Sequence, residues 1–243
     1  MRAWWAQTRA EVAMTIRRGE TLLVTIGIPV LLLVFFSLTH VTASPATRRV
    51  DFIAPGILAL CVLSTSLVAL SIATGFERAS GVLRRLHVTP LGRRRLIGAK
   101  VAGVLVTEVL QVIVVSAIAL LLGWRPRSGL LGAFDVILIL VLGSAGLAGV
   151  GLALAGWLRA EVNLAATNGL YLVLLLLSGI VVPLTSLPTL VRRIVIGLPS
   201  GAMAEALHRV LGQGARPTGA DWLSLALWAV AAPILAARTF RVD

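Results

Sequence analysis

A carboxylate in the middle of an apolar stretch is the side chain of this sequence best placed to do chemistry. Glu108 lies near the centre of the apolar run 97–123, and Gln111 follows one helical turn later on the same face. A charge at the centre of a membrane costs about 2.5–3.5 kcal/mol on insertion scales, so Glu108 should face protein or water. Two interpretations stay open: a polar patch lining a substrate path or seam, or an interhelical clamp bonded by Gln111, Asn168 or Tyr171.

No catalytic or metal-binding motif accompanies this carboxylate. The nearest approach to a nucleotide-binding loop, Gly98-Ala99-Lys100-Val101, lacks the upstream glycine and the Ser or Thr after the lysine. Cys61 is the only cysteine, so it can form neither an intrachain disulfide nor a metal cluster. The three histidines are far apart in sequence, and we expect each at the surface, His208 included. The sequence therefore predicts a chain that is not an enzyme and holds no metal or cofactor.

The elements that position these residues are membrane spans. The mean hydropathy is +0.97, and 58% of the 243 residues are hydrophobic against 13% charged, which excludes an ordinary soluble domain. A helix needs about 20 apolar residues to cross the hydrocarbon core of a membrane. Six segments qualify: Thr21–Thr39, Ile53–Gly75, Ile97–Gly123, Leu131–Trp157, Leu164–Leu184 and Trp222–Ala237. We expect one all-α membrane domain over residues 1–243.

The distribution of basic residues predicts the orientation. Of the 22 Lys and Arg residues, 14 lie on the side of the two termini and eight on the other side. Cytoplasmic segments carry the excess of Lys and Arg, so both termini should be cytoplasmic in a multi-pass protein of the plasma membrane. The net charge of +12 is explained by arginines that flank spans and contact lipid headgroups, and no folded basic surface remains for nucleic acid.

Residues 1–20 predict an interfacial helix. Trp5, Val12 and Ile16 can share one face with Trp4 beside them, while arginines point elsewhere. Tryptophans at headgroup level with arginines on the wet face are typical of a helix lying along the membrane surface. A solvated helical leader is the alternative.

Residues 185–212, between the fifth and sixth spans, are too apolar for a free loop and too interrupted for a span. Prolines at Pro183, Pro188 and Pro199 divide the region into short helices that begin just after a proline. Such helices favour a re-entrant pair that dips into the membrane and shapes an outer mouth. A helical cap on the outer surface is the alternative.

The fourth span is rich in small residues. Ala145, Gly149 and Ala153 repeat every four positions, a pattern that lets helix backbones approach closely. Packing within the chain and a seam between two chains explain this pattern equally well.

The charged interval between the second and third spans, FERASGVLRRLHVTPLGRRRLIGAK over residues 76–100, carries the motif with the clearest likeness. It resembles the cytoplasmic loop of the ABC type-2 permease family, with two departures from the family pattern at Ala79 and Arg84. The matching positions are Glu77-Arg78, Gly81, Leu83, Leu86, Thr89-Pro90-Leu91 and Arg93. The region of Pro183, Leu187-Pro188, Leu198-Pro199 and 206–209 is similar to the family's outer re-entrant segment, so the likeness covers essentially the whole chain.

The resemblance implies a permease subunit of an ATP-driven exporter. In this family the segment 76–91 would be the coupling helix that docks on a separate ATP-binding subunit, which supplies ATP and Mg²⁺. The residues expected to couple are Phe76, Glu77, Arg78, Gly81, Leu83, Leu86, Thr89 and Pro90. A second permease, identical or homologous, would complete the pathway, and Glu108, Gln111 and Asn168 would lie on that pathway or at the seam.

The residues themselves add a physical argument for such a partner. The segment Phe76–Leu86 places apolar side chains among charges, which suits a short helix inserted in a cleft, and Pro90 ends it. The apolar spans favour an amphipathic, drug-like or lipid-like cargo. Two other classes stay open: a proton-coupled secondary transporter with Glu108 and Asp135 as a relay, and a non-transporting scaffold or sensor whose loop binds a cytosolic partner.

Overall fold

The computed structural model describes residues 19–39, 48–82, 92–179 and 188–239. Within these ranges the chain is helical and contains no strand. The π-helical segments η1 and η3 each continue an α-helix. The elements are α2 (Gly19–Leu38), α3 (Arg49–Val62), η1 (Leu63–Ala69), α4 (Leu70–Ala79), α6 (Gly92–Leu121), α7 (Leu130–Trp157), α8 (Ala160–Leu177), α9 (Thr189–Gly197), α10 (Pro199–Leu207), η3 (His208–Gln213) and α11 (Gly219–Thr239).

The predicted all-α membrane architecture is confirmed. Five helical stretches are long and apolar enough to cross a membrane, or six if the bent pair of α9 with α10–η3 counts as one span. These stretches are Arg49–Ala79, Gly98–Leu121, Leu130–Trp157, Ala160–Leu177 and Gly219–Thr239. Helix α2 has 20 residues and coincides with the predicted first span. Residues 1–18 of the predicted interfacial helix lie outside the described residues.

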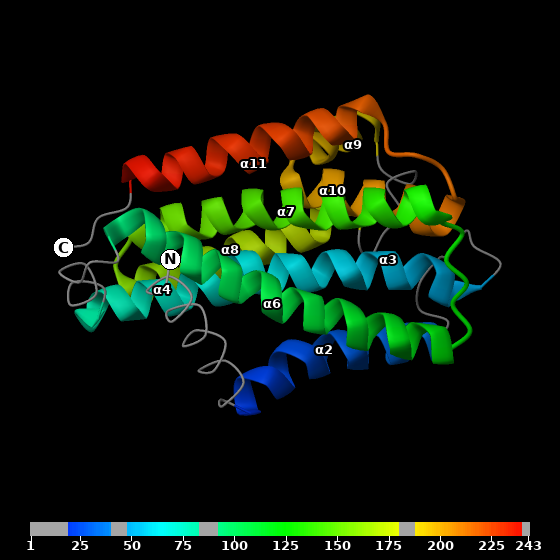
Figure 1. The fold of residues 1–243 in the computed structure, drawn as a ribbon, viewed down its shortest axis with the longest axis horizontal. Helices are drawn as coiled ribbons and strands as arrows, with labels where there is room; N and C mark the ends of the chain where they lie inside the picture. The colour runs from blue at the N-terminus through cyan, green and yellow to red at the C-terminus, as the bar shows by residue number, and fades with distance from the viewer. Residues whose placement is uncertain (1–18, 40–47, 83–91, 180–187, 240–243) are drawn as a thin grey trace.

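The second span, Arg49–Ala79, is the axis of the bundle. It consists of α3, η1 and α4 in one continuous run. Of its most apolar 18-residue stretch, 72% is buried, against 22% of the corresponding stretch in Ala160–Leu177 and in Gly219–Thr239. Figure 1 shows α3 and α4 running lengthwise through the molecule, with α6 and α7 alongside. The end that carries Ala79 and the start of α6 is called the loop end below, and the end that carries Arg49 and α10 the re-entrant end.

The small residues of the fourth span pack within the chain. A Cβ atom on Gly149 would lie 2.5 Å from the backbone of Ala232 and Pro233 in α11, and one on Gly146 would lie 3.1 Å from Trp228. Small side chains at these positions let the backbones of α7 and α11 approach closely. Of the two explanations left open by the sequence, packing inside the subunit accounts for this face.

Residues 189–213 form a re-entrant pair in which α9 and the α10–η3 run are bent by 99°. Leu198 is extended at the bend, and Pro199 is the first residue of α10, where a missing N–H is harmless. Pro188 directly precedes α9, so α9 begins just after a proline as predicted, whereas α10 begins one position earlier than predicted, at Pro199 itself. Pro183 lies outside the described residues. Because Ala202, Met203 and Ala206 are fully buried and α10 packs against α3, α7 and α11, α10 enters the bundle, whereas α9 has a single buried residue, Val195.

Candidate functional site

Polar side chains at the loop end join the second span to its neighbours. The sequence favoured a separate short helix beginning at Phe76 and running to Leu86, and this boundary is wrong. Residues Phe76 to Ala79 form the last turn of α4, and the chain then turns at Gly81, whose φ of 73° is left-handed. Only glycine adopts this conformation without strain, so it separates the span from the loop beyond. Leu83, Leu86, Thr89 and Pro90 lie outside the described residues.

Arg78 binds the end of the fourth span. Its Nη1 donates to the carbonyl oxygen of Gly156 and its Nη2 to that of Leu158. The last carbonyls of a helix have no partner within the helix, and a guanidinium supplies two donors in a planar fork. Arg78 therefore fastens α4 to the C-terminus of α7, just before the connection to α8.

Glu77 forms an ion pair with the third span. Its Oε2 lies 2.5 Å from Nζ of Lys100 in α6, and the side chains are 27% and 4% exposed, respectively. Phe76, by contrast, is 46% exposed and Val82 40% exposed. Of the residues predicted to couple, the structure thus directs Glu77 and Arg78 into the subunit and leaves Phe76 at the surface.

Glu108 lies at the centre of a polar cluster between three spans. The Ser66 hydroxyl donates to its Oε1 over 2.6 Å, and the Ser144 hydroxyl of α7 donates to its Oε2. Gln111, fully buried, accepts from Thr65 at 3.0 Å and donates to the carbonyl oxygen of Thr25 at 2.9 Å. Glu108 and Gln111 are thus neighbours, as predicted, but each has its own partners.

The segment η1 explains how Thr65 and Ser66 both reach α6. Successive residues of a regular α-helix point about 100° apart, which follows from 3.6 residues per turn. The wider π-helical turn of Leu63–Ala69 lets these two neighbours contact Gln111 and Glu108 on one helix. Single-turn π segments are frequent at functional sites, and the hydropathy pattern did not predict this one.

A second buried cluster joins α4 to α8. The Ser71 hydroxyl contacts Oδ1 of Asn163 at 3.0 Å and Oγ1 of Thr167 at 3.1 Å, and Nδ2 of Asn163 donates to the Ser71 carbonyl at 3.0 Å. A Cβ on Gly75 would approach Nδ2 of Asn163 to 2.7 Å, so a larger residue there would displace the amide of Asn163. The predicted Asn168 does not belong to this cluster: it is exposed and its Nδ2 bonds the carbonyl of Leu164 within its own helix.

The cluster of Asn163 and Thr167 was missed by sequence reasoning. Their spacing of four positions puts both side chains on one helical face, and that spacing was the available indication. Asn168, one position further along, points about 100° away from Thr167.

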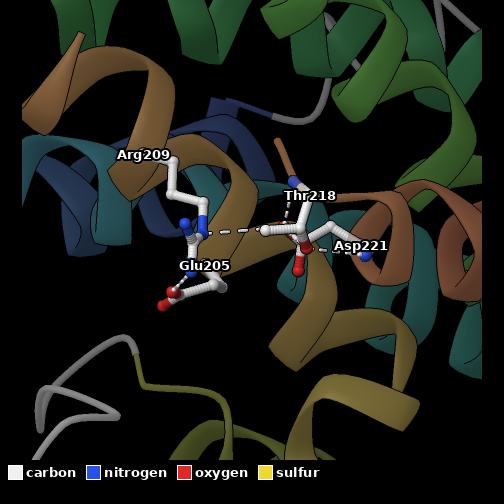
Figure 2. Close-up of polar contacts among 4 residues, drawn as sticks. All are labelled: Glu205, Arg209, Thr218 and Asp221. Atoms are coloured by element: carbon white, nitrogen blue, oxygen red, sulfur yellow. Dashed lines mark hydrogen bonds and ion pairs between the residues drawn. The ribbon is translucent and has the colours of Figure 1, made fainter. Parts of the chain in front are cut away.

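A third polar group fastens the re-entrant pair to α11 (Figure 2). Arg209 contacts Oε1 of Glu205 at 2.9 Å and Oδ2 of Asp221 at 3.7 Å. The backbone N–H and hydroxyl of Thr218 donate to the same carboxylate at 2.8 and 2.7 Å. The neighbouring His208, expected at the surface, is instead buried and stacks on Phe52 with ring centroids 4.5 Å apart. Pro188 is exposed and Pro199 buried at this end.

These three groups arrange polar contacts along a mostly apolar bundle, and none has the composition of a catalytic centre. In the ranges that the structure describes, no three His, Cys, Asp or Glu side chains gather as metal ligands would. What the arrangement can do is hold the second span to α6, α7 and α8.

A comparison with known families gives a match that covers most of the chain. The family model described as ABC-2 type transporter matches residues 2–209, which include the second span, its loop, Lys100 and α10. A comparison with curated proteins gave no match. Since the family model covers well over half of the 243 residues, the chain belongs to the ABC-2 type transporter family and is a membrane-spanning permease component, not a nucleotide-binding domain.

Proposed function

We propose that this permease exports an amphipathic, drug-like or lipid-like substrate across the plasma membrane. It would work with a separate ATP-binding subunit, which holds ATP and Mg²⁺, and with a second permease, identical or homologous. Both termini and the loop end would be cytoplasmic. The family supports the ATP-binding partner in general terms, and the excess of basic residues near the termini supports the orientation.

The observation that carries the proposed docking is the surface at the loop end. Phe76 and Val82 are exposed apolar residues on either side of the turn at Gly81, where the most buried span of the bundle passes into residues 83–91. An exposed apolar side chain at this place suits insertion into a groove of a partner. Leu83, Leu86, Thr89 and Pro90 would extend this surface along the loop.

The polar residues of the spans take two different places in this proposal. Glu108 and Gln111, both buried and bonded inside the subunit, would hold the spans together beside the pathway. Asn168 faces outward from a span of which only 22% is buried, which supports a place at the seam with the second permease. Pro183, Pro188 and Pro199 would shape the outer mouth.

A pull-down tests the proposal directly. The tagged chain is purified from host membranes in mild detergent and its partners are identified by mass spectrometry. We expect a P-loop ATPase, recovered in smaller amount with Phe76→Ser. Leu190→Ser, which changes an equally apolar residue exposed in α9, is the control and should not alter recovery. Recovery of the chain without any ATPase, under conditions that preserve a known transporter complex, would contradict the proposal.

The alternatives give other results in the same system. A proton-coupled transporter would depend on a pH gradient and would survive inactivation of the ATPase, whereas a scaffold would transport nothing. No described contact favours the proposed relay: Glu108 is enclosed by Ser66 and Ser144, while Asp135 lines a pocket of about 270 Å³ at the re-entrant end with Arg216.

A further inference from the structure

Accepting the proposed function, we propose that Glu77 and Arg78 are positioning residues that act inside the permease. They fasten the loop end of the second span to α6 and α7, so that a push on the loop 83–91 moves these helices as one body. Their role would then be distinct from docking, which falls to the exposed apolar residues beside them.

The ion pair closes the base of the loop. Glu77 lies in the last turn of α4, before the loop, and Lys100 lies in α6, after it. Lys100 is eight residues into α6, so the pair ties the two helices about 12 Å along α6 from its start, at 1.5 Å per residue. Figure 1 places the end of α4 and the start of α6 at the same end of the bundle. A displacement of the loop therefore reaches both helices together.

Arg78 extends this connection to the fourth and fifth spans. Its guanidinium holds the carbonyl oxygens of Gly156 and Leu158 at the C-terminus of α7. Helix α8 begins at Ala160, so only Leu158 and Arg159 separate it from α7. The contacts of two consecutive residues thus join three of the spans at the loop end, and the short connection places the start of the fifth span next to them.

The burial of Lys100 makes this connection a fixed one. Its side chain is 4% exposed, and separation from Glu77 would remove a counter-charge from an ammonium group sheltered from water. The position is also the only lysine of the chain, the other 21 basic residues being arginines. An ammonium is a compact charge on an unbranched stem, whereas a guanidinium has five donors to satisfy. We therefore expect the pair to stay closed throughout the transport cycle.

A charge-swap series in the reconstituted complex of permease and ATP-binding subunit tests this role. The variants are Glu77→Lys, Lys100→Glu and the two together, and the readouts are ATPase recovery and permease-stimulated ATP hydrolysis. We expect each single variant to retain the ATPase but lose stimulation about tenfold, and the double variant to regain most of it, as for two residues in direct contact. Glu161→Lys is the matched control: it reverses an exposed acid in the first turn of α8 and should leave both readouts unchanged.

A chemical cross-link tests the same contact if the double charge-swap variant does not fold. In a Cys61→Ala background, which removes the only cysteine, Glu77→Cys and Lys100→Cys are joined by a short bifunctional thiol reagent. We expect the unlinked protein to be uncoupled and the linked protein to regain stimulation, because the tie is restored and need not open. A link that forms and abolishes the remaining stimulation would overturn the fixed connection.

Two further outcomes separate this inference from the proposed function. If Glu77→Lys abolishes ATPase recovery and Lys100→Glu does not restore it, Glu77 is a docking contact and the inference is wrong. If the unmodified permease recovers no ATPase at all, the proposed function fails, whereas the yield of the cross-link still reports whether positions 77 and 100 lie together.

Discussion

The second span and helix α10 of the re-entrant pair are both buried in the bundle, yet they are held there by different forces. Polar side chains of the second span bond to residues far away in sequence, such as Ser71 to Thr167, 96 positions apart. The ion pairs of the re-entrant pair are closer in sequence: Glu205 and Arg209 are four positions apart, and Asp221 belongs to the next helix. Its longer-range hydrogen bonds are made by its backbone carbonyls, which accept from Trp228 at Gly197 and from Arg127 at Leu211. The pair is held in the bundle chiefly by the close apolar packing of α10.

This difference predicts which kind of substitution should destabilise each region. A change of size should damage the re-entrant pair, because tight packing tolerates no additional atoms. A change of polarity should damage the second span, because a buried polar group that loses its partner is costly. The predictions below test this contrast, and the free energy of unfolding can be measured by denaturant titration in mixed micelles.

The largest effect is expected for Gly201→Ala at the bend of the re-entrant pair. The added methyl group would overlap the Val195 carbonyl oxygen and lie 2.7 Å from its carbonyl carbon, so the 99° bend must open. We expect a loss of about 3 kcal/mol, the upper part of the range for overpacking. Gly197→Ala adds the same methyl group one position before the bend, where nothing lies within 4 Å, and should be nearly neutral. Equal effects of the two substitutions would mean that tight packing does not define the bend.

Glu108→Ala tests the sensitivity of the second span to polarity. The substitution removes the acceptor of the buried hydroxyls of Ser66 and Ser144, and we expect a loss of about 2 kcal/mol. Glu108→Gln retains the shape and an acceptor oxygen and should cost clearly less. If alanine and glutamine cost the same, the charge of Glu108 rather than its hydrogen bonds holds the spans together.

A smaller effect is expected at the contact between α4 and α8. Asn163→Ala removes the acceptor and donor that meet Ser71, and interhelical hydrogen bonds in membranes contribute about 1 kcal/mol or less. Asn168→Ala changes the same residue type at an exposed position of the same helix and should alter the unfolding free energy very little. If Asn168→Ala lowers the unfolding free energy of the isolated permease more than Asn163→Ala does, then Asn163 is not the residue that joins α4 to α8.

The smallest effect is expected for Arg209→Ala. Arg209 is 24% exposed and Glu205 13%, and a partly exposed ion pair contributes about 0.5 kcal/mol. The buried carboxylate of Asp221 lies further away, at 3.7 Å, and keeps its two hydrogen bonds from Thr218 when Arg209 is removed. A double-mutant cycle with Glu205→Ala measures the pair itself. A coupling above about 2 kcal/mol would show that polar contacts hold the re-entrant pair as firmly as they hold the second span, and the contrast between the two regions would be lost.

Much of the fold could be predicted because hydropathy is a local property. Five predicted spans coincide with helices that meet the length and apolarity of a membrane crossing, and prolines marked both helices of the re-entrant pair. The ends were less accurate: the fifth span was expected at Leu164–Leu184, and the helix is Ala160–Leu177. Its polar first turn, with Glu161 and Asn163, concealed the start of the helix from a search for apolar residues.

The candidate site was predicted only in part, since its residues meet across helices. The sequence indicated that Glu108 must find polar partners, but not that they are Ser66 and Ser144. It also drew attention to Glu77 and Arg78 without indicating that both point into the subunit. Serine and threonine are common in membrane helices, so their presence alone does not identify a partner.

The sequence by itself determined the membrane class, the approximate spans, the family resemblance and the need of a buried carboxylate for partners. Tertiary structure alone decided that α11 packs on the small residues of α7 and that Thr65 and Ser66 of η1 both contact α6. It also decided that Lys100 forms the ion pair with Glu77. The physical reason lies in the range of each effect. Transfer into the membrane depends on each segment's own composition, whereas the pairing of polar side chains depends on the rotation and position of helices that are distant in sequence.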